Sequence, residues 1–461
     1  MRRDLATAYL AAAAKVGSWA VVFALAYRLL TPGEVAILVL ARSTLGLLNY
    51  ASFGLAPAMV RGLAEALNTP NRVLPIMEVP GHAIAYATPA TLDPEDGGRA
   101  VRRLYFSGHV IGFTSCLVAA TLAVVAVFVF DDIGWIGTRD ARLGQVILVL
   151  SMGVGTGLRL MSDAASAVLQ THGRIAVDNR LLIITELIWV AGVALAAFVA
   201  SPPSHPFSLG AIGLPFVVAS AFLLFARNWA ANGAVKLDFG NHGLFHLPTA
   251  RALVASGLVL TFAQLADFLY APTDFVLIAH LLGPTDVAAY APLVQIDAAL
   301  LLLVTGLAGV LLPRAAVAHA GGDVAAVRAY FVRGTLASLG MLTVAAAVVW
   351  AASPWLFTVW LGDDLPASRA ILPLLLVHTV MGGSSAVGRS MLLGMGRVKP
   401  FAVAALLAGV GNVVLSYCFV KYLGLGLNGI VLGTIVAVVG RCVIWQPWYV
   451  MRCLGTAARL G

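Results

Sequence analysis

The chain has 461 residues, of which 60% are hydrophobic and only 11% are charged. Soluble proteins carry roughly 25% charged residues, so this composition excludes a soluble globular protein and predicts a protein embedded in a membrane. The formal net charge of +8 would favour an anionic partner in a soluble protein, but here the membrane topology explains most of it.

Apolar runs of about 20 residues, the length that crosses a bilayer as a helix, recur along the whole chain. Sustained runs favour helices over a transmembrane barrel, whose strands alternate apolar and polar residues. We therefore expect an all-α polytopic membrane protein with about 12 transmembrane helices. The expected helices cover residues 5–30, 34–60, 104–130, 143–169, 178–200, 209–231, 252–280, 286–312, 328–351, 369–394, 400–422 and 427–450.

Positive charge indicates the orientation of these helices. An even number of spans places both termini on one side of the membrane, and most of the arginines in loops fall on that side. The positive-inside rule then makes both termini cytoplasmic. The loops predicted on the other side carry Arg28, Arg139, Arg142, Arg369 and Lys421.

The second half of the chain echoes the first. Residues 29–36 (LLTPGEVA) return as residues 281–288 (LLGPTDVA), an offset of 252, and residues 169–175 (LQTHGRI) match residues 392–398 (LLGMGRV) at an offset of 223. Internal repeats of this kind build many transporters. Helix 5–30 has an internal counterpart, which argues against a cleaved signal peptide.

The repeat predicts two pseudo-symmetric bundles. Six helices lie in residues 1–231 and six in residues 252–461, and residues 232–251 form a cytoplasmic linker between them. Each bundle has an even number of spans, so the two have the same orientation. Residues 61–103 form a proline-rich cytoplasmic insertion that is expected to lack regular helix.

Ten of the charged residues inside the predicted spans are candidate functional residues. A charge at the centre of a transmembrane helix costs about 2.5–3.5 kcal/mol, so these side chains are expected to face protein, water or one another. The basic members are Lys15, Arg42, Arg159, Arg389 and Arg441, and the acidic members are Asp163, Glu186, Asp267, Asp274 and Asp297.

Three of the acids have an expected role from their place in the sequence. The offset of 252 carries Lys15 onto Asp267, which suggests either a cavity feature or an ion pair that stabilises the interface between the bundles. Arg159 and Asp163 lie four residues apart on one helix face, and we expect an internal neutralising pair. Asp274 follows Pro272, which would kink the helix and suits a hinge or an ion site.

No catalytic or cofactor motif accompanies these charges. The chain has no P-loop, no HExxH, no CxxC and no GxSxG with accompanying partners. We therefore expect no enzyme activity, no cofactor, no metal centre and no nucleic-acid partner. Cys116, Cys418, Cys442 and Cys453 show no disulfide pattern.

A further set of motifs is spread over nearly the whole chain. They are Leu29–Glu34 followed by Gly54–Arg61, then Leu281–Pro284, Tyr290, Leu311–Arg314, Gly394–Arg397, Asn412 and Gly426–Ile430. In these motifs the chain resembles the Wzx-type oligosaccharide flippases of the multidrug/oligosaccharidyl-lipid/polysaccharide exporter (MOP) superfamily.

The resemblance implies a V-shaped pair of six-helix bundles around a central cationic cavity. The cargo it implies is a polyprenyl-pyrophosphate-linked oligosaccharide, moved from the cytoplasmic to the periplasmic leaflet of the bacterial inner membrane by alternating access, for cell-surface polysaccharide biosynthesis. Membrane lipid and other polysaccharide-assembly proteins are the further partners to expect. Lys15, Arg42, Arg159, Arg441 and Arg389 would line the cavity. The acids Asp267, Asp274, Asp163, Glu186 and Asp297 would serve ion coupling or pairing between the bundles.

Two other functions remain open at this point. A drug/cation antiporter of the same superfamily would favour a cavity dominated by acids and aromatic residues, whereas here both signs are present and the cations lie deeper. A membrane-embedded sugar polymerase or glycosyltransferase would need a sizeable loop with catalytic carboxylates. The long 61–103 loop offers only Glu95 and Asp96, in a turn rich in proline and glycine.

Overall fold

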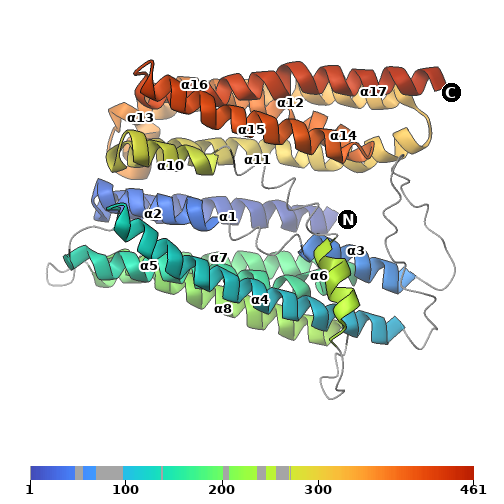
Figure 1. Cartoon of the computed structure of the whole chain (residues 1–461), viewed down its shortest axis with the longest axis horizontal. Coiled ribbons are helices and arrows are strands. Elements are labelled where there is room, and N and C mark those ends of the chain that lie inside the picture. The colour runs from blue at the N-terminus through green and yellow to red at the C-terminus, as the bar shows by residue number, and fades with distance from the viewer. Residues whose placement is uncertain are drawn as a thin grey trace. The chain divides into compact units, whose positions relative to one another are not determined.

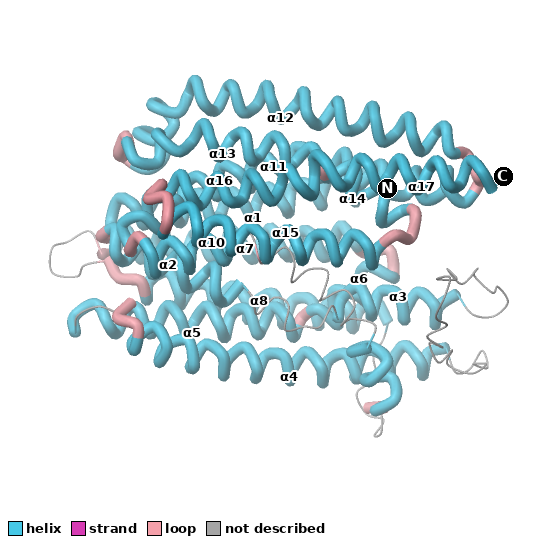
Figure 2. The backbone as a smooth tube through the Cα atoms, turned by 45° about the horizontal axis from the view of Figure 1, so that its top comes forward, coloured by secondary structure: helices cyan, strands magenta, loops and turns pink. Residues whose placement is uncertain are grey.

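A computed structural model describes residues 2–46, 55–68, 97–135, 139–200, 207–235, 245–255, 269 and 271–460 of the chain. Helices make up all the regular structure in these ranges (Figures 1 and 2). Ten stretches of the described chain are long and apolar enough to cross a membrane. The all-α, multi-span architecture expected from the composition is therefore confirmed.

The helices follow the expected order along the chain. Their bounds are α1 Arg2–Leu29, α2 Pro32–Leu45, α3 Leu55–Asn68, α4 Gly97–Asp132, α5 Arg139–Met161, α6 Asp163–Thr171, α7 Ile175–Val199, α8 Gly210–Val235, α10 Ala271–Leu281, α11 Pro284–Ala320, α12 Val324–Leu361, α13 Pro366–Ser384, α14 Ala386–Gly394, α15 Val398–Lys421, α16 Gly426–Val438, a π-helical segment Val439–Trp445, and α17 Gln446–Leu460.

Two expected helices are described only in part. Helix 34–60 corresponds to α2 and the start of α3, and residues 47–54 between them lie outside the described chain. Helix 252–280 corresponds to the helical residues 247–255 and to α10, and residues 256–268 and 270 lie outside it. The expectation that the insertion 61–103 lacks helix is wrong at both ends, because α3 continues to Asn68 and α4 begins at Gly97. All five prolines of the insertion lie between these two ends, so nothing interrupts the helices there.

Contacts divide the chain into two compact units. The N-unit comprises Met1–Ser18 and Thr44–Gln264, and the C-unit comprises Trp19–Ser43 and Leu265–Gly461. The division passes through α1, so residues 19–43 group with the C-terminal half and not with the N-terminal bundle expected from the sequence. The expected bundles, residues 1–231 and 252–461 with the linker 232–251 between them, stay a prediction.

Each unit has an apolar core of its own. In the N-unit, α5 packs on α4 and α8, and residues of α3, α4, α6 and α8 form a cluster that includes Met59 and Tyr105. In the C-unit, α11 packs on α12 and α14, and α15 packs on α16, around a cluster that includes Phe331 and Met391.

The fourth helix of each repeat breaks at an equivalent serine. Ser162 separates α5 from α6, and Ser385 separates α13 from α14, at the same offset of 223 seen in the sequence echo. Their backbone angles agree (φ −79°, ψ −9° and φ −74°, ψ −11°). The side-chain Oγ of each donates to the carbonyl three residues earlier, at 2.6 Å in both cases. The sequence predicted continuous helices here because the apolar runs continue through both breaks.

The short helices after the breaks also end alike. Gly173 and Gly396 have φ values of 70° and 73°, a conformation that favours glycine. Arg174 N donates to Leu169 O, and Arg397 N donates to Leu392 O, each at 2.8 Å. The two halves thus share local hydrogen bonding as well as sequence, and this places residues of the two units in a common register.

Close helix packing in the N-unit gives a first stability prediction. A Cβ added at Gly153 of α5 would overlap the Cβ of Ala123 of α4 and lie 3.3 Å from Ala119 O. Gly153→Ala should therefore destabilise the protein by about 1–3 kcal/mol through overpacking. Gly340→Ala in α12, where the added Cβ meets nothing within 4 Å, is the matched control. Thermal unfolding in detergent measures both, and equal melting temperatures for the two variants would contradict the prediction.

Candidate functional site

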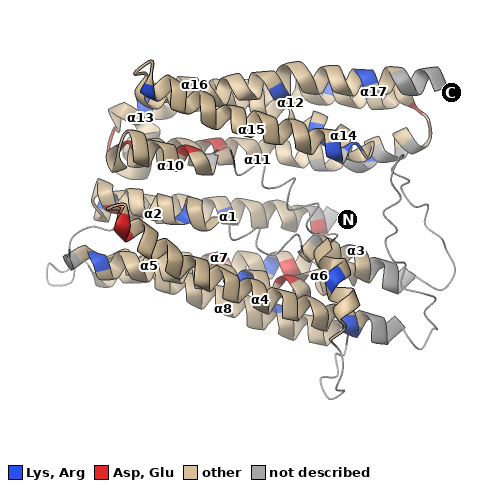
Figure 3. Ribbon diagram, in the orientation of Figure 1, with Lys and Arg blue, Asp and Glu red and all other residues tan. Residues whose placement is uncertain are grey.

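Charged side chains are sparse along the helices and cluster at a few places inside them (Figure 3). The first cluster surrounds Arg159, near the end of α5. Arg159 Nη1 lies 2.9 Å from Glu186 Oε1 of α7, and Nε donates to Ser220 Oγ of α8 at 3.2 Å. Ser18 Oγ of α1 donates to Glu186 Oε2 at 2.6 Å. The guanidinium also lies 4.5 Å above the ring of Phe216.

One donor of this guanidinium remains unused. Arg159 Nη2 is buried and has no hydrogen-bond partner among the described residues. A buried, unsatisfied charged donor is costly, so this atom marks a place where an external acceptor would be stabilised. The Arg159–Glu186 pair therefore leaves one guanidinium donor that can bind an external acceptor.

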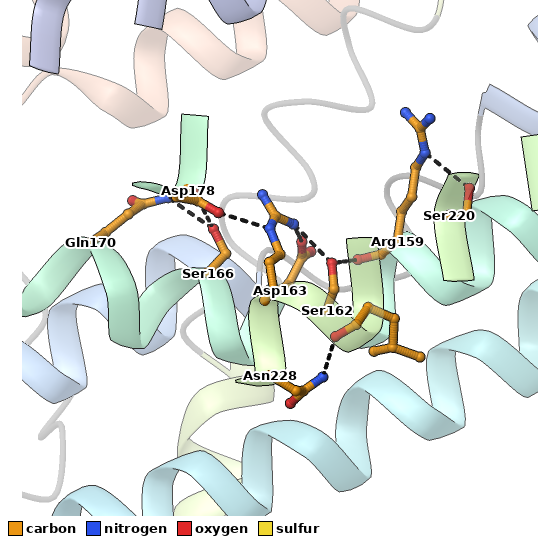
Figure 4. Close-up of polar contacts among 10 residues, drawn as sticks. Arg159, Ser162, Asp163, Ser166, Gln170, Asp178, Ser220 and Asn228 are labelled. Atoms are coloured by element: carbon orange, nitrogen blue, oxygen red, sulfur yellow. Dashed lines mark hydrogen bonds and ion pairs between the residues drawn. The ribbon is translucent and has the colours of Figure 1, made fainter. Parts of the chain in front are cut away.

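A second cluster surrounds Arg227 of α8 (Figure 4). Arg227 Nε donates to Asp178 Oδ1 at 2.8 Å, and Nη1 donates to Ser162 Oγ at the same distance. Nη1 also lies 3.9 Å from Asp163 Oδ1. Ser162 connects this cluster to the first one, because its hydroxyl donates to the carbonyl of Arg159. Ser166 and Gln170 donate to Asp178 Oδ2 at 2.7 and 3.2 Å.

These contacts correct one expectation and add two residues. Arg159 and Asp163 do not neutralise one another, because the helix breaks at Ser162 between them and each turns to another helix. Arg227 and Asp178 were not expected to matter. Arg227 was assigned to the cytoplasmic positive charge, yet its side chain is 6% exposed. The sequence signal for this pair was the position of Asp178 and Arg227, which lie at the cytoplasmic ends of two neighbouring predicted helices, 178–200 and 209–231.

In the C-unit, Asp274 of α10 is 1% exposed and lies in a pocket of neutral polar groups. Asn412 Nδ2 of α15 donates to Asp274 Oδ1 at 3.1 Å. Thr434 of α16 and Tyr290 of α11 each donate to Oδ2 at 3.3 Å. Ser416 and Thr434 also donate to the carbonyl of Ile430. No basic side chain within the described ranges forms an ion pair with Asp274.

Two further groups lie elsewhere in the C-unit. Asp297 Oδ1 accepts from Thr379 Oγ1 at 2.5 Å and lies 3.8 Å from His378 Nδ1. Arg42 stacks on Trp19, with the guanidinium carbon 3.8 Å from the ring centroid. With the amide of Gln295 oriented so that its oxygen faces Arg42, this oxygen accepts from both terminal nitrogens of the guanidinium.

The structure also describes three further residues expected to line the cavity. Lys15 of α1 is exposed, one helical turn before Ser18. Arg389 of α14 is exposed, and its guanidinium lies 5.5 Å from the Phe401 ring centroid. Arg441 lies in the π-helical segment, with Nε 3.3 Å from Cys442 Sγ. Asp267 lies outside the described residues, so its pairing with Lys15 stays a prediction.

The chain is similar to several known proteins. The family model MatE matches residues 260–418. The "uncharacterized membrane protein EpsK" of Bacillus subtilis (strain 168) is 24% identical over 400 residues, covering 78% of each chain. An inward-facing multidrug resistance MATE family transporter of the MOP superfamily gives a TM-score of 0.72 at 12% identity, covering 96% of each chain. The lipid II flippase MurJ in an inward closed conformation gives 0.67 at 12% identity, covering 98% of this chain and 88% of that one.

The fold is therefore the MATE-like fold of two six-helix lobes. The fold and the MatE match over residues 260–418 make the chain similar to multi-span membrane transporters, among them a MATE family transporter of the MOP superfamily. The superfamily resemblance seen in the sequence agrees with these similarities. The fold is shared by a multidrug transporter and by a lipid flippase, so the cargo must be argued from this chain's own residues.

Proposed function

We propose that the chain is a flippase for a polyprenyl-pyrophosphate-linked oligosaccharide, moving it from the cytoplasmic to the periplasmic leaflet of a bacterial inner membrane. The observation that supports this most is Arg159. It is a guanidinium inside a membrane span, with one buried donor that no described residue satisfies. A phosphate oxygen is the acceptor that arginine binds best, through charge-assisted hydrogen bonds.

The chain has basic residues of the kind that this cargo needs in order to cross a membrane. A pyrophosphate and a chain of sugars cannot cross hydrocarbon without compensating contacts. Arg42, Arg441, Lys15 and Arg389 add positive charge within or beside the spans, and in our proposal they line the route with Arg159. Arg42 stacks on Trp19, which fixes its guanidinium for a planar, directional contact. Lys15 and Arg389 are exposed and would make looser, water-mediated contacts.

A drug/cation antiporter is the alternative, and it is supported by the MatE family match and the multidrug transporter structures. Such a transporter needs acids free to attract a cationic drug. In the N-unit, however, Glu186, Asp178 and Asp163 already face arginines. Among these groups the buried atom without a hydrogen-bond partner is a donor, Arg159 Nη2, which favours an anionic cargo over a cationic one.

Asp274 is the acid best suited to bind a coupling cation. Of the expected ion-coupling acids that the structure describes, Glu186 and Asp163 face arginines and Asp297 faces His378. Asp274 faces hydroxyl and amide groups only, beside the carbonyls of Leu269 and Ile430, which accept from Asn412 and Thr434. Carboxylate, hydroxyl and carbonyl oxygens are the ligands that hard cations prefer, and sodium is the cation we propose.

Reconstitution into liposomes tests the cargo. Purified protein should move a polyprenyl-pyrophosphate-linked oligosaccharide between leaflets, measured by the accessibility of its sugars to an external lectin. Arg159→Met should reduce the rate by at least about tenfold, the loss expected for one charge-assisted bond. Arg142→Met, at an exposed pair with Asp131, should leave it unchanged. Transport of a lipophilic cation instead, with no lipid movement, would favour the antiporter.

A further inference from the structure

The two units contain polar pockets built by corresponding helices of the repeat. In the N-unit the pocket is formed by the first, fifth and sixth helices of the repeat, which are α1, α7 and α8. In the C-unit it is formed by their counterparts α10, α15 and α16. Each pocket contains one buried carboxylate surrounded by side-chain oxygens. The groups are Ser18, Glu186 and Ser220 in the N-unit, and Asp274, Asn412 and Thr434 in the C-unit.

The register of the repeat shows that these pockets correspond. The offset of 252 places Ser18 four residues before Asp274, and the offset of 223 places Glu186 three residues before Asn412. Gly210 and Gly426 begin α8 and α16 at an offset of 216, which places Ser220 two residues after Thr434. The sixth helix runs antiparallel to the other two, so all three shifts have the same direction. The pockets therefore differ by about one helical turn along the bundle axis.

The pockets differ in what balances the carboxylate. In the N-unit the guanidinium of Arg159 reaches in from α5, with Nη1 2.9 Å from Glu186 and Nε 3.2 Å from Ser220. In the C-unit the position of Arg159 corresponds to Gly382 at the offset of 223, which has no side chain to enter the pocket. The described residues place no positive charge against Asp274.

We infer that Arg159 is a built-in counter-cation that takes the place of an alkali cation in the N-unit pocket. This inference about Arg159 rests on the proposed coupling cation at Asp274 only where the two pockets are compared. Arg159 holds the N-unit pocket permanently filled, so of these two described pockets the one in the C-unit stays open to an exchangeable cation. Nη2 stays available to an anionic cargo. Arg159 would therefore balance Glu186 with one edge of its guanidinium and bind the cargo with another.

Electrostatics explains why an external cation should enter if the arginine is removed. Glu186 is 4% exposed, and removing one partner of a buried ion pair leaves an uncompensated charge that is strongly destabilising. The carboxylate of Glu186 and the hydroxyls of Ser18 and Ser220 would then form an oxygen-lined pocket suited to a hard cation. A sodium ion bound in this pocket would stabilise only the folded state. Sodium should therefore raise the stability of a variant that lacks Arg159 more than that of the wild type.

The test is the number of sodium ions bound by the purified full-length chain in detergent, measured with radioactive sodium at alkaline pH against choline. Arg159→Met should bind one more sodium ion per chain than the wild type. Arg159→Lys, which keeps a positive charge, should bind no extra ion. The double variant Arg159→Met with Glu186→Gln should also bind no extra ion, because it removes both charges of the pair.

A second measurement covers variants that fold poorly. Arg159→Ala leaves a space of guanidinium shape, so low concentrations of guanidinium should raise its melting temperature while leaving that of the double variant unchanged. An unaltered sodium count in Arg159→Met, together with no guanidinium rescue of Arg159→Ala, would overturn the inference. Failure of the flippase proposal would not affect these counts, since no cargo is present. Asp274→Asn should lower the count by one in every background, which separates the two sites.

Discussion

Arg227→Met is expected to destabilise the protein by about 3–5 kcal/mol, the effect of removing one partner of a buried ion pair. Arg227 is 6% exposed and Asp178 is 3% exposed, and their atoms lie 2.8 Å apart. Without the guanidinium, Asp178 keeps its charge inside the bundle with only Ser166 and Gln170 to stabilise it. Ser162 Oγ, at the break between α5 and α6, loses a donor in the same step.

The exposed pair Arg142–Asp131 is the matched control for this prediction. Its atoms are 2.5 Å apart, but the side chains are 54% and 36% exposed. Arg142→Met should therefore change stability by only about 0.2–1 kcal/mol. Unfolding in detergent by denaturant, followed by tryptophan fluorescence, measures both variants. A destabilisation of Arg227→Met no larger than that of Arg142→Met would show that water or lipid headgroups reach Asp178.

A double-mutant cycle isolates the pair from the packing of the arginine side chain. Adding Asp178→Asn to Arg227→Met removes the uncompensated charge, so the double variant should be more stable than Arg227→Met alone. The coupling energy should fall at the upper end of the range for contacting residues, about 3 kcal/mol. Strict additivity of the two single substitutions would contradict the pairing seen in the structure.

Much of the fold could be predicted because its signals are local. Apolar runs gave the helices, and the glycine at the end of each LQTHGRI-like segment marked a turn that both units form, at Gly173 and at Gly396. The breaks at Ser162 and Ser385 could not be predicted from hydropathy, since a serine in an apolar run does not interrupt its periodicity. The same serines stand at matching positions of the repeat, and that correspondence was the available signal.

The sequence predicted several charged residues of the site but not which of them pair with one another. Sequence spacing identifies neighbours on one helix, so Arg159 was paired with Asp163, four residues away. The structure pairs it with Glu186, a contact between helices that depends on packing. Arg227 was missed for a different reason. The positive-inside rule explains any arginine near a cytoplasmic helix end, and it therefore hides one that is buried.

Asp274→Asn is expected to abolish the sodium dependence of transport while leaving the protein folded. The substitution removes a charge but keeps the size of the side chain, and the amide can still accept from Asn412, Thr434 or Tyr290. A neutral pocket cannot attract a cation strongly enough to remove its hydration shell. In liposomes, the wild type should move its cargo faster when a sodium gradient is applied, and the variant should show the same rate with or without the gradient.

Asp364→Asn is the control for this last prediction. Asp364 lies in the same unit, but its side chain is 49% exposed and pairs with Arg369 near the surface. It should retain the sodium response. If Asp274→Asn keeps the response and Asp297→Asn loses it, the coupling site is the Asp297–His378 group instead. If the wild type responds to a proton gradient and not to a sodium gradient, and Asp297→Asn loses that response, the Asp297–His378 pair acts as a proton relay, as intramembrane Asp and His groups do in pumps and transporters. The sodium and proton responses of these two variants thus assign the coupling ion and its site together.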